Sequence, residues 1–457
     1  MKILLATPIV LATAAVTAAA APVTFQTIAV TGETAPGTGG GVFVPFFGLP
    51  SVNSSGKVSF YANFSGGSDP NVTRGHYTVG PGGTTLLLSQ GDAITGTSKT
   101  FNFDSGIALA PINDSGTLAL APQLIPARGG GDNSLLTIAP DGTVTVLAIE
   151  DDPAPGTNNE IFRLIDTPSL NNANQIAFVA GTEDASGDFF FDDTLYRYDP
   201  NTGFELLAEA GDPAPLPGNA TFANDFRDPI IGADGTVVFD AGVSGGDDGL
   251  FKADPLGTIT AIALEGSTVA TPEFGGNVFS SFSSQVVNAS GQVLFDGSVE
   301  QTGAVTGANN EGLFLLDTSG TLSLVMREGE TVPGDPDKTF QDPSGKELAF
   351  NDDGTFALVA EFDEAGFAER EGLFFGDTAT GAIDLILAEG ELFEVLPGDF
   401  RTIDGFDLRP SGGAGRFIAL DVDFTDDSDA IILVTIPEPS SLTLLGLGGL
   451  TLLRRRR

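Results

Sequence analysis

The stretch GLFLLDTSGTLSLVMREGETVPG, residues 312–334, contains the two features that decide the fold. In its first part, apolar residues flank Asp317-Thr318-Ser319-Gly320, a pattern typical of a tight turn between two β-strands. Its last part, GETVPG from Gly329, is an acidic turn that ends in proline and glycine. Both features recur along the chain, which indicates one supersecondary unit repeated in tandem.

The acidic turn occurs seven times, at steps of 55 to 63 residues. The copies are GETAPG at Gly32, GDAITG at Gly91, DDPAPG at Asp151, GDPAPLPG at Gly211, GSTVATP at Gly266, GETVPG at Gly329 and GELFEVLPG at Gly390. Six copies place a carboxylate at the second position, and Ser267 is the exception. These repeat-turn carboxylates are Glu33, Asp92, Asp152, Asp212, Glu330 and Glu391.

A second landmark, N-x-x-G followed by alternating apolar residues, comes after each acidic turn. Asn and Gly tolerate positive φ, so the landmark predicts a turn that leads into a strand. The copies are NSSGKVSF at Asn53, NDSGTLAL at Asn113, NNANQIAF at Asn171, GADGTVVF at Gly232, NASGQVLF at Asn288, NDDGTFAL at Asn351 and a degraded PSGGAGRFIAL at Pro410. Two landmarks that keep one period make the repeat assignment strong.

An apolar stretch such as residues 43–52 also precedes each N-x-x-G turn. Together with the strand after this turn and the two strands of the hairpin, it gives four short strands in each repeat. Seven such units predict an all-β fold, a seven-bladed β-propeller of four-stranded blades. The strand Val23 to Val30 precedes the first unit, and the last unit ends one strand short at residues 431–436. We therefore expect the N-terminal strand to complete the last blade and close the ring. An open β-solenoid or a string of small sandwiches is the alternative.

Residues 1–21 have the pattern of a secretory signal peptide. Lys2 precedes the apolar run ILLATPIVLATAAV, and Ala18-Ala19-Ala20 offers small-residue cleavage sites. The run is too short for a membrane-spanning helix with the usual flanks, and a buried N-terminal helix is the alternative. We expect residues 22–436 to form the propeller and residues 437–457 to form a sorting or anchor segment.

The C-terminus combines a rigid acidic motif, an apolar stretch of 14 residues and a basic end. This stretch, Ser440 to Leu453, predicts a short apolar helix, but it falls short of the roughly 20 residues that cross a relaxed bilayer. Arginines after it would hold that end on the cytoplasmic side of a membrane. The motif residues are Pro437, Glu438, Pro439, Arg454, Arg455, Arg456 and Arg457.

This tail resembles the PEP-CTERM sorting signal of Gram-negative bacteria, a segment also described as an ice-binding protein C-terminal domain. The resemblance implies that an exosortase in the inner membrane recognises and removes the tail, and it implies association with exopolysaccharide and biofilm matrix. The ice-binding label implies no ice binding here, because the tail is a shared sorting module. A plain membrane anchor is the alternative. The repeats, roughly residues 25 to 436, resemble bacterial surface proteins with a tandem NxxGxxxF repeat.

The charge of the chain excludes several classes of partner. The 457 residues include 61 acidic and 20 basic ones, a net charge of −41. Without Lys2, Glu438 and the four terminal arginines, 60 acidic and 15 basic residues remain, a net charge of −45. Such a surface repels nucleic acids and anionic lipids. The 35 phenylalanines argue against disorder, and the absence of cysteine excludes disulfides and thiol chemistry.

No residue pattern assembles a catalytic centre. His76 is the only histidine, and without a nucleophile it is best interpreted as a core or rim position. Ser244 lies in the G-x-S-x-G string of residues 242–246, but a nucleophile elbow needs a following helix, and a Gly-rich loop is expected here. We therefore expect no catalytic residues and no enzyme activity.

The acidic residues leave two interpretations open. Each turn carboxylate can cap its own turn through backbone N–H groups, and the loop clusters can simply be solvated. Alternatively, they bind Ca²⁺, since hard oxygen ligands in flexible loops suit this ion and it is the one cofactor that the sequence suggests. The loop candidates are Asp184, Asp188, Asp192 and Asp193, and the stronger metal hypothesis rests on Asp421, Asp423, Asp426, Asp427 and Asp429.

Together these patterns predict an exported cell-surface or extracellular-matrix protein that acts as a non-catalytic binding or structural module. The expected partners are signal peptidase and an exosortase-type protease during export, then exopolysaccharide or matrix proteins, with membrane contact through the tail. The alternative is a polysaccharide-active enzyme, a glycosidase or lyase that uses two carboxylates. Such an enzyme should interrupt the repeat with unique carboxylates near the axis.

Overall fold

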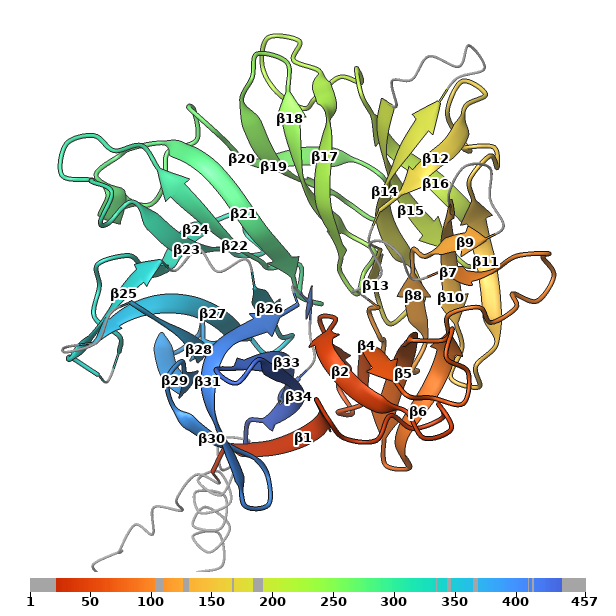
Figure 1. Ribbon diagram of the computed structural model, residues 1–457. Helices are drawn as coiled ribbons and strands as arrows, with labels where there is room; N and C mark the ends of the chain where they lie inside the picture. Colours follow the sequence, from red (N-terminus) through yellow and green to blue (C-terminus); the bar gives the residue numbers. More distant parts are fainter. Residues whose placement is uncertain are drawn as a thin grey trace, which may run out of the picture.

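The computed structural model describes residues 22–102, 110–125, 131–166, 168–183, 192–333, 335–342, 347–364, 369–409, 411–412 and 415–437. The regular structure in these ranges consists of strands and one short 3-10 helix, η1 (Pro272–Phe274). The strands form seven sheets arranged around a central axis (Figure 1). The predicted all-β, seven-bladed propeller is confirmed. The signal peptide, the expected C-terminal helix and the tail from residue 438 lie outside the described residues.

Blades 1 to 4 follow the chain in order, and within each blade the strands run from the axis outward. Several inner strands are split in two. Blade 1 holds β2 (Val42–Phe47), β3 (Ser51–Val52), β4 (Val58–Ser65), β5 (Arg74–Gly80) and β6 (Gly83–Ser89). Blade 2 holds β7 (Thr100–Asn102), β8 (Leu118–Leu120), β9 (Gln123–Ile125), β10 (Asp132–Ile138) and β11 (Val144–Ile149). Blade 3 holds β12 (Ile161–Ile165), β13 (Ser169–Leu170), β14 (Ile176–Glu183), β15 (Asp192–Asp199) and β16 (Gly203–Glu209). Blade 4 holds β17 (Phe222–Ile231), β18 (Val237–Val243), β19 (Asp248–Ala253) and β20 (Ile259–Leu264).

Blades 5 to 7 complete the ring. Blade 5 holds β21 (Phe279–Val287), β22 (Val293–Val299), β23 (Glu311–Leu316) and β24 (Leu322–Arg327). Blade 6 holds β25 (Lys338–Asp342), β26 (Leu348–Phe350), β27 (Thr355–Glu364), β28 (Arg370–Asp377) and β29 (Ala382–Ala388). Blade 7 holds β30 (Leu392–Leu396), β31 (Asp399–Leu408), β33 (Phe417–Phe424), β34 (Ser428–Thr435) and, from the other end of the chain, β1 (Thr24–Val30). The short strand β32 (Ser411–Gly412), between β31 and β33 in the chain, pairs in parallel with β26 and so extends the sheet of blade 6.

The ring closes through the pairing of β1 with β34. The two strands are antiparallel, with Thr24 opposite Thr435 and Val30 opposite Ala430. Figure 1 shows β1 at the outer edge of blade 7, so that both ends of the propeller lie at the same place. The expected completion of the last blade by the N-terminal strand is confirmed, and it covers the strand edge of β34 that would otherwise be open.

Apolar side chains fill the spaces between neighbouring blades. Seven separate clusters of buried residues each join one blade to the next. Phenylalanine dominates several of them; Phe239 and Phe251, for example, stack with ring centroids 5.6 Å apart. This arrangement explains the two-sided burial of the second strands, such as β18, whose seven residues are all buried.

The acidic turns join the outer strand of one blade to the inner strand of the next. In blade 4 the N–H of Gly211 donates to the carbonyl of Phe222 at 2.9 Å, and the N–H of Phe222 donates to the carbonyl of Asp212 at 2.9 Å. The same reciprocal pair recurs at other blades, with Phe43, Phe162 or Phe340 as the inner-strand residue. A buried phenylalanine at the start of the inner strand is thus part of the turn motif.

The N-x-x-G asparagines link neighbouring blades in a girdle around the axis. Asn53 Nδ2 donates to the carbonyl of Asn113 at 2.9 Å, Asn113 Nδ2 donates to Asn171 at 3.1 Å, and Asn171 Nδ2 donates to Gly232 at 2.9 Å. In blade 5, Asn288 Nδ2 donates to the carbonyl of Asn351 at 3.3 Å. The repeated asparagine therefore has a structural role that the turn pattern alone did not indicate.

Replacement of Asn288 by Ala should destabilise the propeller. The Asn288 side chain is 1% exposed, and its Oδ1 also accepts the N–H groups of Ser290 and Gln292 at 3.0 and 3.1 Å. Loss of these buried hydrogen bonds should lower the free energy of unfolding by about 3 kcal/mol. Asn71→Ala, at an exposed turn, should change it by less than about 0.5 kcal/mol. Denaturant unfolding measures both, and equal values would refute the girdle's contribution to stability.

Among the described residues, no helix is long and apolar enough to cross a membrane.

Candidate functional site at the junction of blades 6 and 7

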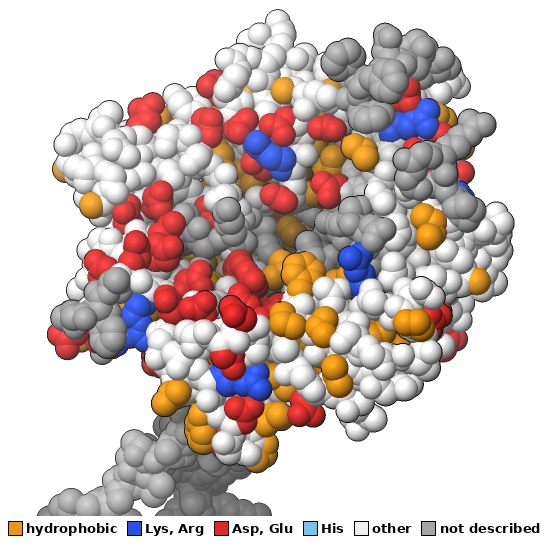
Figure 2. Space-filling view, viewed as in Figure 1, with side chains coloured by type: hydrophobic (Ala, Val, Ile, Leu, Met, Phe, Trp, Pro, Cys, Tyr) orange, Lys and Arg blue, Asp and Glu red, His pale blue; other side chains and the backbone are white. Residues whose placement is uncertain are grey.

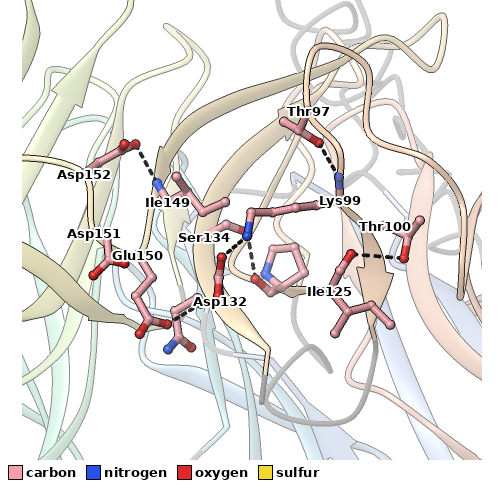
Figure 3. Close-up of polar contacts among 12 residues, drawn as sticks. Thr97, Lys99, Thr100, Ile125, Asp132, Ser134, Ile149, Glu150, Asp151 and Asp152 are labelled. Atoms are coloured by element: carbon pink, nitrogen blue, oxygen red, sulfur yellow. Dashed lines mark hydrogen bonds and ion pairs between the residues drawn. The ribbon is translucent and has the colours of Figure 1, made fainter. Parts of the chain in front are cut away.

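The aspartates of the acidic turns bind backbone groups of their own turns. Asp92, Asp152 and Asp212 each accept the N–H of the residue three positions earlier, at 2.7, 3.0 and 3.1 Å respectively. Figure 3 shows Asp152 directed toward the amide of Ile149. The turns lie one per blade junction, so the ring spaces these carboxylates apart rather than gathering them into one site.

A glutamate directly before four of the seven acidic turns, Glu150, Glu265, Glu328 and Glu389, caps the start of a third strand. Glu150 Oε2 accepts the N–H of Asn133 at 3.2 Å, an interaction visible in Figure 3. Glu265 and Glu389 make the equivalent bonds to Asp248 and Glu371, both at 3.2 Å. Much of the periodic acidity is therefore structural.

The aspartates proposed for calcium lie on β33, on β34 and in the turn between them, and two of them, Asp426 and Asp429, already have hydrogen-bond partners. Asp423 lies opposite Asp429 in the β33–β34 pair. Asp429 Oδ2 accepts the N–H of Phe46 at 2.6 Å, and Asp426 accepts the hydroxyl of Ser428. Among the described residues, no group of three His, Cys, Asp or Glu side chains is arranged to hold a metal ion. The calcium site, including Asp421 and Asp427, stays a prediction.

The other loop candidates give no site. Asp184 and Asp188 lie outside the described residues, and Asp192 and Asp193 begin β15. The tail residues of the sorting motif also lie outside, except Pro437.

His76 and Ser244 have structural surroundings, as their sequence contexts indicated. His76 is fully buried in β5, its Nδ1 is 3.0 Å from the carbonyl of Phe60, and burial lowers its pKa to about 4. Ser244 follows β18 in a turn that leads to another strand, and its Oγ accepts the N–H of Thr221 at 2.9 Å. The contacts described for His76 and Ser244 therefore belong to the packing and hydrogen bonding of the fold.

Unexpected carboxylates converge where the inner strands of blades 6 and 7 meet. Glu347 precedes β26, and Asp407 lies near the end of β31. Burial, together with a hydrogen bond and repulsion from Asp407, raises the pKa of Glu347 to about 9. Glu347 Oε2 also accepts the N–H of Leu408 at 2.5 Å. At neutral pH this side chain is therefore a neutral carboxylic acid beside a second carboxyl group.

Further acidic groups of blade 6 extend this cluster. Glu371 Oε2 accepts the N–H of Phe406 at 3.2 Å, and burial followed by repulsion from Asp407 raises the pKa of Glu371. Glu361 lies directly opposite Glu371 across β27 and β28. Burial and a hydrogen bond with Glu369 raise the pKa of Glu361 to about 7. We call Glu347, Glu361, Glu371 and Asp407 the junction cluster.

Three blades carry an additional buried aspartate at one structural position. Asp240, Asp296 and Asp421 lie on the second strands of blades 4, 5 and 7, opposite Arg227, Ser283 and Asp407 of the inner strands. Burial raises the pKa of each, that of Asp240 to about 6. Tyr61 and Val179 occupy the corresponding position five residues after the turn in blades 1 and 3. The ring is therefore chemically asymmetric.

The surface shows the same asymmetry. In Figure 2, acidic side chains gather over blades 4 to 7 and beside the central depression, whereas hydrophobic side chains are prominent near blade 1. The junction cluster was not found from the sequence, because Glu347 and Asp407 are 60 residues apart and lie outside both landmarks. The available signal was a carboxylate shortly before the N-x-x-G landmark, but blades 3 and 4 also carry one there, Asp166 and Asp228, so the pattern alone does not single out the junction of blades 6 and 7.

The junction cluster should make stability depend on pH. A carboxyl whose pKa is raised in the folded state stabilises the fold at low pH, and this contribution is lost as pH rises from the unfolded pKa of about 4.3 through the folded one. For Glu347 the loss continues to about pH 9 and amounts to about 1.4 kcal/mol per pH unit. Glu347→Gln should therefore flatten the decline in melting temperature between pH 6 and 9.

Asp384→Asn is the matched control, since it makes the same replacement of a carboxyl by an amide on an exposed side chain, on β29 of the same blade. Melting curves of the two variants and the wild type over this pH range measure the effect. An identical pH profile for wild type and Glu347→Gln would refute the raised pKa.

Fold and tail together define the class: an exported seven-bladed β-propeller. Residues 435–457 match the PEP-CTERM protein-sorting motif, which implies sorting by an exosortase-type system to the surface or the exterior of the cell. Residues 11–324 and 269–443 match the family described as "Family of unknown function (DUF7453)". The chain belongs to this family. The ice-binding label and the likeness to NxxGxxxF-repeat proteins stay predictions.

Solved structures share the fold at very low sequence identity. Oligogalacturonate lyase in complex with manganese is 12% identical over 92% of this chain and 97% of its own, with a TM-score of 0.50. The β-propeller domain of the Trilobed protease from Pyrococcus furiosus, described as having an open velcro topology, is 11% identical over 86% of this chain and 95% of its own, with a TM-score of 0.47. No curated protein matches the chain. At such identity the likeness concerns the fold alone.

Proposed function

We propose that the mature protein is a non-catalytic binding module of the cell surface or extracellular matrix, and that the junction cluster binds an uncharged or amino-sugar exopolysaccharide. The observation that carries the proposal is the pair formed by Glu347 and Asp407. A neutral carboxylic acid lies beside a second carboxyl group, so the pair offers both an O–H donor and oxygen acceptors, and sugar hydroxyl groups need both kinds of partner.

The charge of the chain supports this choice of ligand. The net charge of −41 disfavours the binding of anionic polymers and favours that of polymers with ammonium groups. Ammonium groups bind half-buried carboxylates more strongly than exposed carboxylates. A divalent cation such as Ca²⁺ bound at blade 7 is a compatible addition. The rigid ring holds the cluster in place, so little conformational freedom is lost on binding.

Export supports the proposed location. Signal peptidase and an exosortase-type protease would remove the two ends, and the propeller would then act outside the inner membrane of a Gram-negative bacterium, in association with biofilm matrix. The sorting motif at residues 435–457 supports the processing step.

The second candidate is a glycosidase or lyase, and the same carboxyl pair favours it. Unique carboxylates near the axis are the asymmetry that we expected of an enzyme, and Glu347 has the raised pKa of a general acid. One protein of the same fold is an oligogalacturonate lyase, yet its 12% identity supports only a shared scaffold. We place binding first because Glu347 is held within the protein, by hydrogen bonds to Asp407 and to the N–H of Leu408.

The mass of the protein recovered from its own host tests the processing. We expect loss of residues 1–21 and of the chain from about Pro437 onward. Intact mass spectrometry measures both ends. A secreted or surface-bound protein that retains the four terminal arginines would contradict exosortase processing and would favour a plain anchor.

Binding to polysaccharides tests the site. Calorimetry with the host's exopolysaccharide and with chitosan oligomers should show binding by the wild type, and the double variant Glu347→Gln with Asp407→Asn should bind at least about tenfold more weakly. Asp384→Asn, with the same kind of charge removal, should bind as the wild type does. Unchanged binding by the double variant would overturn the site. New chain ends that wild type generates and Glu347→Gln does not would identify the enzyme instead.

A further inference from the structure

An arginine is buried beside the axis of the propeller, away from the junction cluster's carboxyl pair. Arg409 follows β31, directly before the degraded N-x-x-G landmark of blade 7. The residues directly before this landmark in blades 1, 2 and 5 are Val52, Ile112 and Val287. Arg409 thus places a cation where other blades contribute apolar side chains, and only 6% of its surface is exposed.

The guanidinium of Arg409 has few partners. Its Nη2 donates to the carbonyl of Pro168, on the far side of the axis in blade 3, at 3.1 Å. Its Nη1 has no hydrogen-bond partner in the described part of the chain, and no ion pair with a described carboxylate is formed. Burial lowers the pKa of Arg409 to about 10, so the group is charged at neutral pH.

Arg409 lines a cavity at the axis with a volume of about 70 Å³. The asparagine girdle and two serines, Ser51 and Ser169, contribute to its wall. Each serine Oγ accepts an inter-blade N–H, from Ile112 at 3.3 Å and from Ile231 at 3.1 Å. Within the described ranges, neither hydroxyl donates to a protein acceptor, so both protons are available to a bound group.

The carboxylates in the cavity wall do not pair with Arg409. Asp114 accepts the N–H of Ser54 and the amide of Asn172, both at 2.8 Å. Asp352 accepts the N–H of Ala289 at 2.7 Å. Both carboxylates thus bind residues of neighbouring blades. The buried charge of Arg409 is left without a counter-ion among the described side chains.

We propose that this axial cavity binds a small monovalent anion, such as chloride, held by Arg409 Nη1 and the hydroxyl groups of Ser51 and Ser169. An uncompensated buried cation is strongly unfavourable, and an anion at this position would offset that cost. A water molecule needs about 10–15 Å³ of such volume, so a cavity of about 70 Å³ has room for a halide with several waters. The bound anion would join blades 1, 3 and 7 across the axis.

Bromide replaces chloride as a probe, because its anomalous scattering locates it. Crystals of the mature protein soaked in sodium bromide should show an anomalous peak within hydrogen-bond distance of Arg409 Nη1. Melting temperature should rise and saturate with sodium chloride relative to sodium gluconate at equal ionic strength, because gluconate is too large for the cavity.

Variants separate this site from a general salt effect. Arg409→Met should abolish the difference between chloride and gluconate, whereas Lys252→Met, a cation removed from β19 in blade 4, should keep it. Ser169→Ala should weaken halide binding about fivefold. If Arg409→Met does not fold, Ser169→Ala provides the test. Absence of a bromide peak, or an undiminished chloride response in Arg409→Met, would overturn the proposal. Both results are independent of polysaccharide binding by the junction cluster.

Discussion

The pairing of β1 with β34 is the constraint on which the rest of the propeller depends. It joins residues from opposite ends of the chain, Thr24 to Thr435 and Val30 to Ala430, and it makes blade 7 a complete sheet. Only a closed ring lets every blade pack apolar side chains against two neighbours, as the seven inter-blade clusters do. Closure also completes blade 7, which carries Asp407 and Arg409, and packs it against blade 1. The function we propose therefore depends on closure as much as the stability does.

Polar residues that recur in the repeats and polar residues that occur once have different roles in this protein. The repeated polar residues mostly serve the fold: turn aspartates cap their own turns, glutamates cap third strands, and N-x-x-G asparagines join blades. The exceptions carry the unusual electrostatics. Glu347, Asp407 and Arg409 occupy inner-strand positions that neither repeated motif specifies, and their surroundings alter the pKa of Glu347 and of Arg409. The needs of the fold account for the repeated polar residues, but they do not account for Glu347, Asp407 and Arg409.

The fold was predictable from the sequence, because period-2 alternation and turn residues are local signals that recur with one spacing. Even the closure was predictable, since an unpaired strand at one end matched a missing strand at the other. The junction cluster was not predictable. Glu347 and Asp407 meet only because their blades are adjacent, and the elevated pKa of Glu347 arises from burial that no local pattern encodes. The aspartates chosen for calcium, such as Asp426 and Asp429, were conspicuous in the sequence, yet the structure gives them partners within the protein.

The most direct test of the junction cluster as a site, rather than as ordinary surface charge, is an NMR titration of mature protein with ¹³Cδ-labelled glutamate. One glutamate should titrate near pH 9, disappear from the spectra of Glu347→Gln, and shift when a bound oligosaccharide is added. If every glutamate titrates below about pH 6, within the ordinary range for this side chain, the buried acid pair does not exist and the proposed binding site has no physical basis.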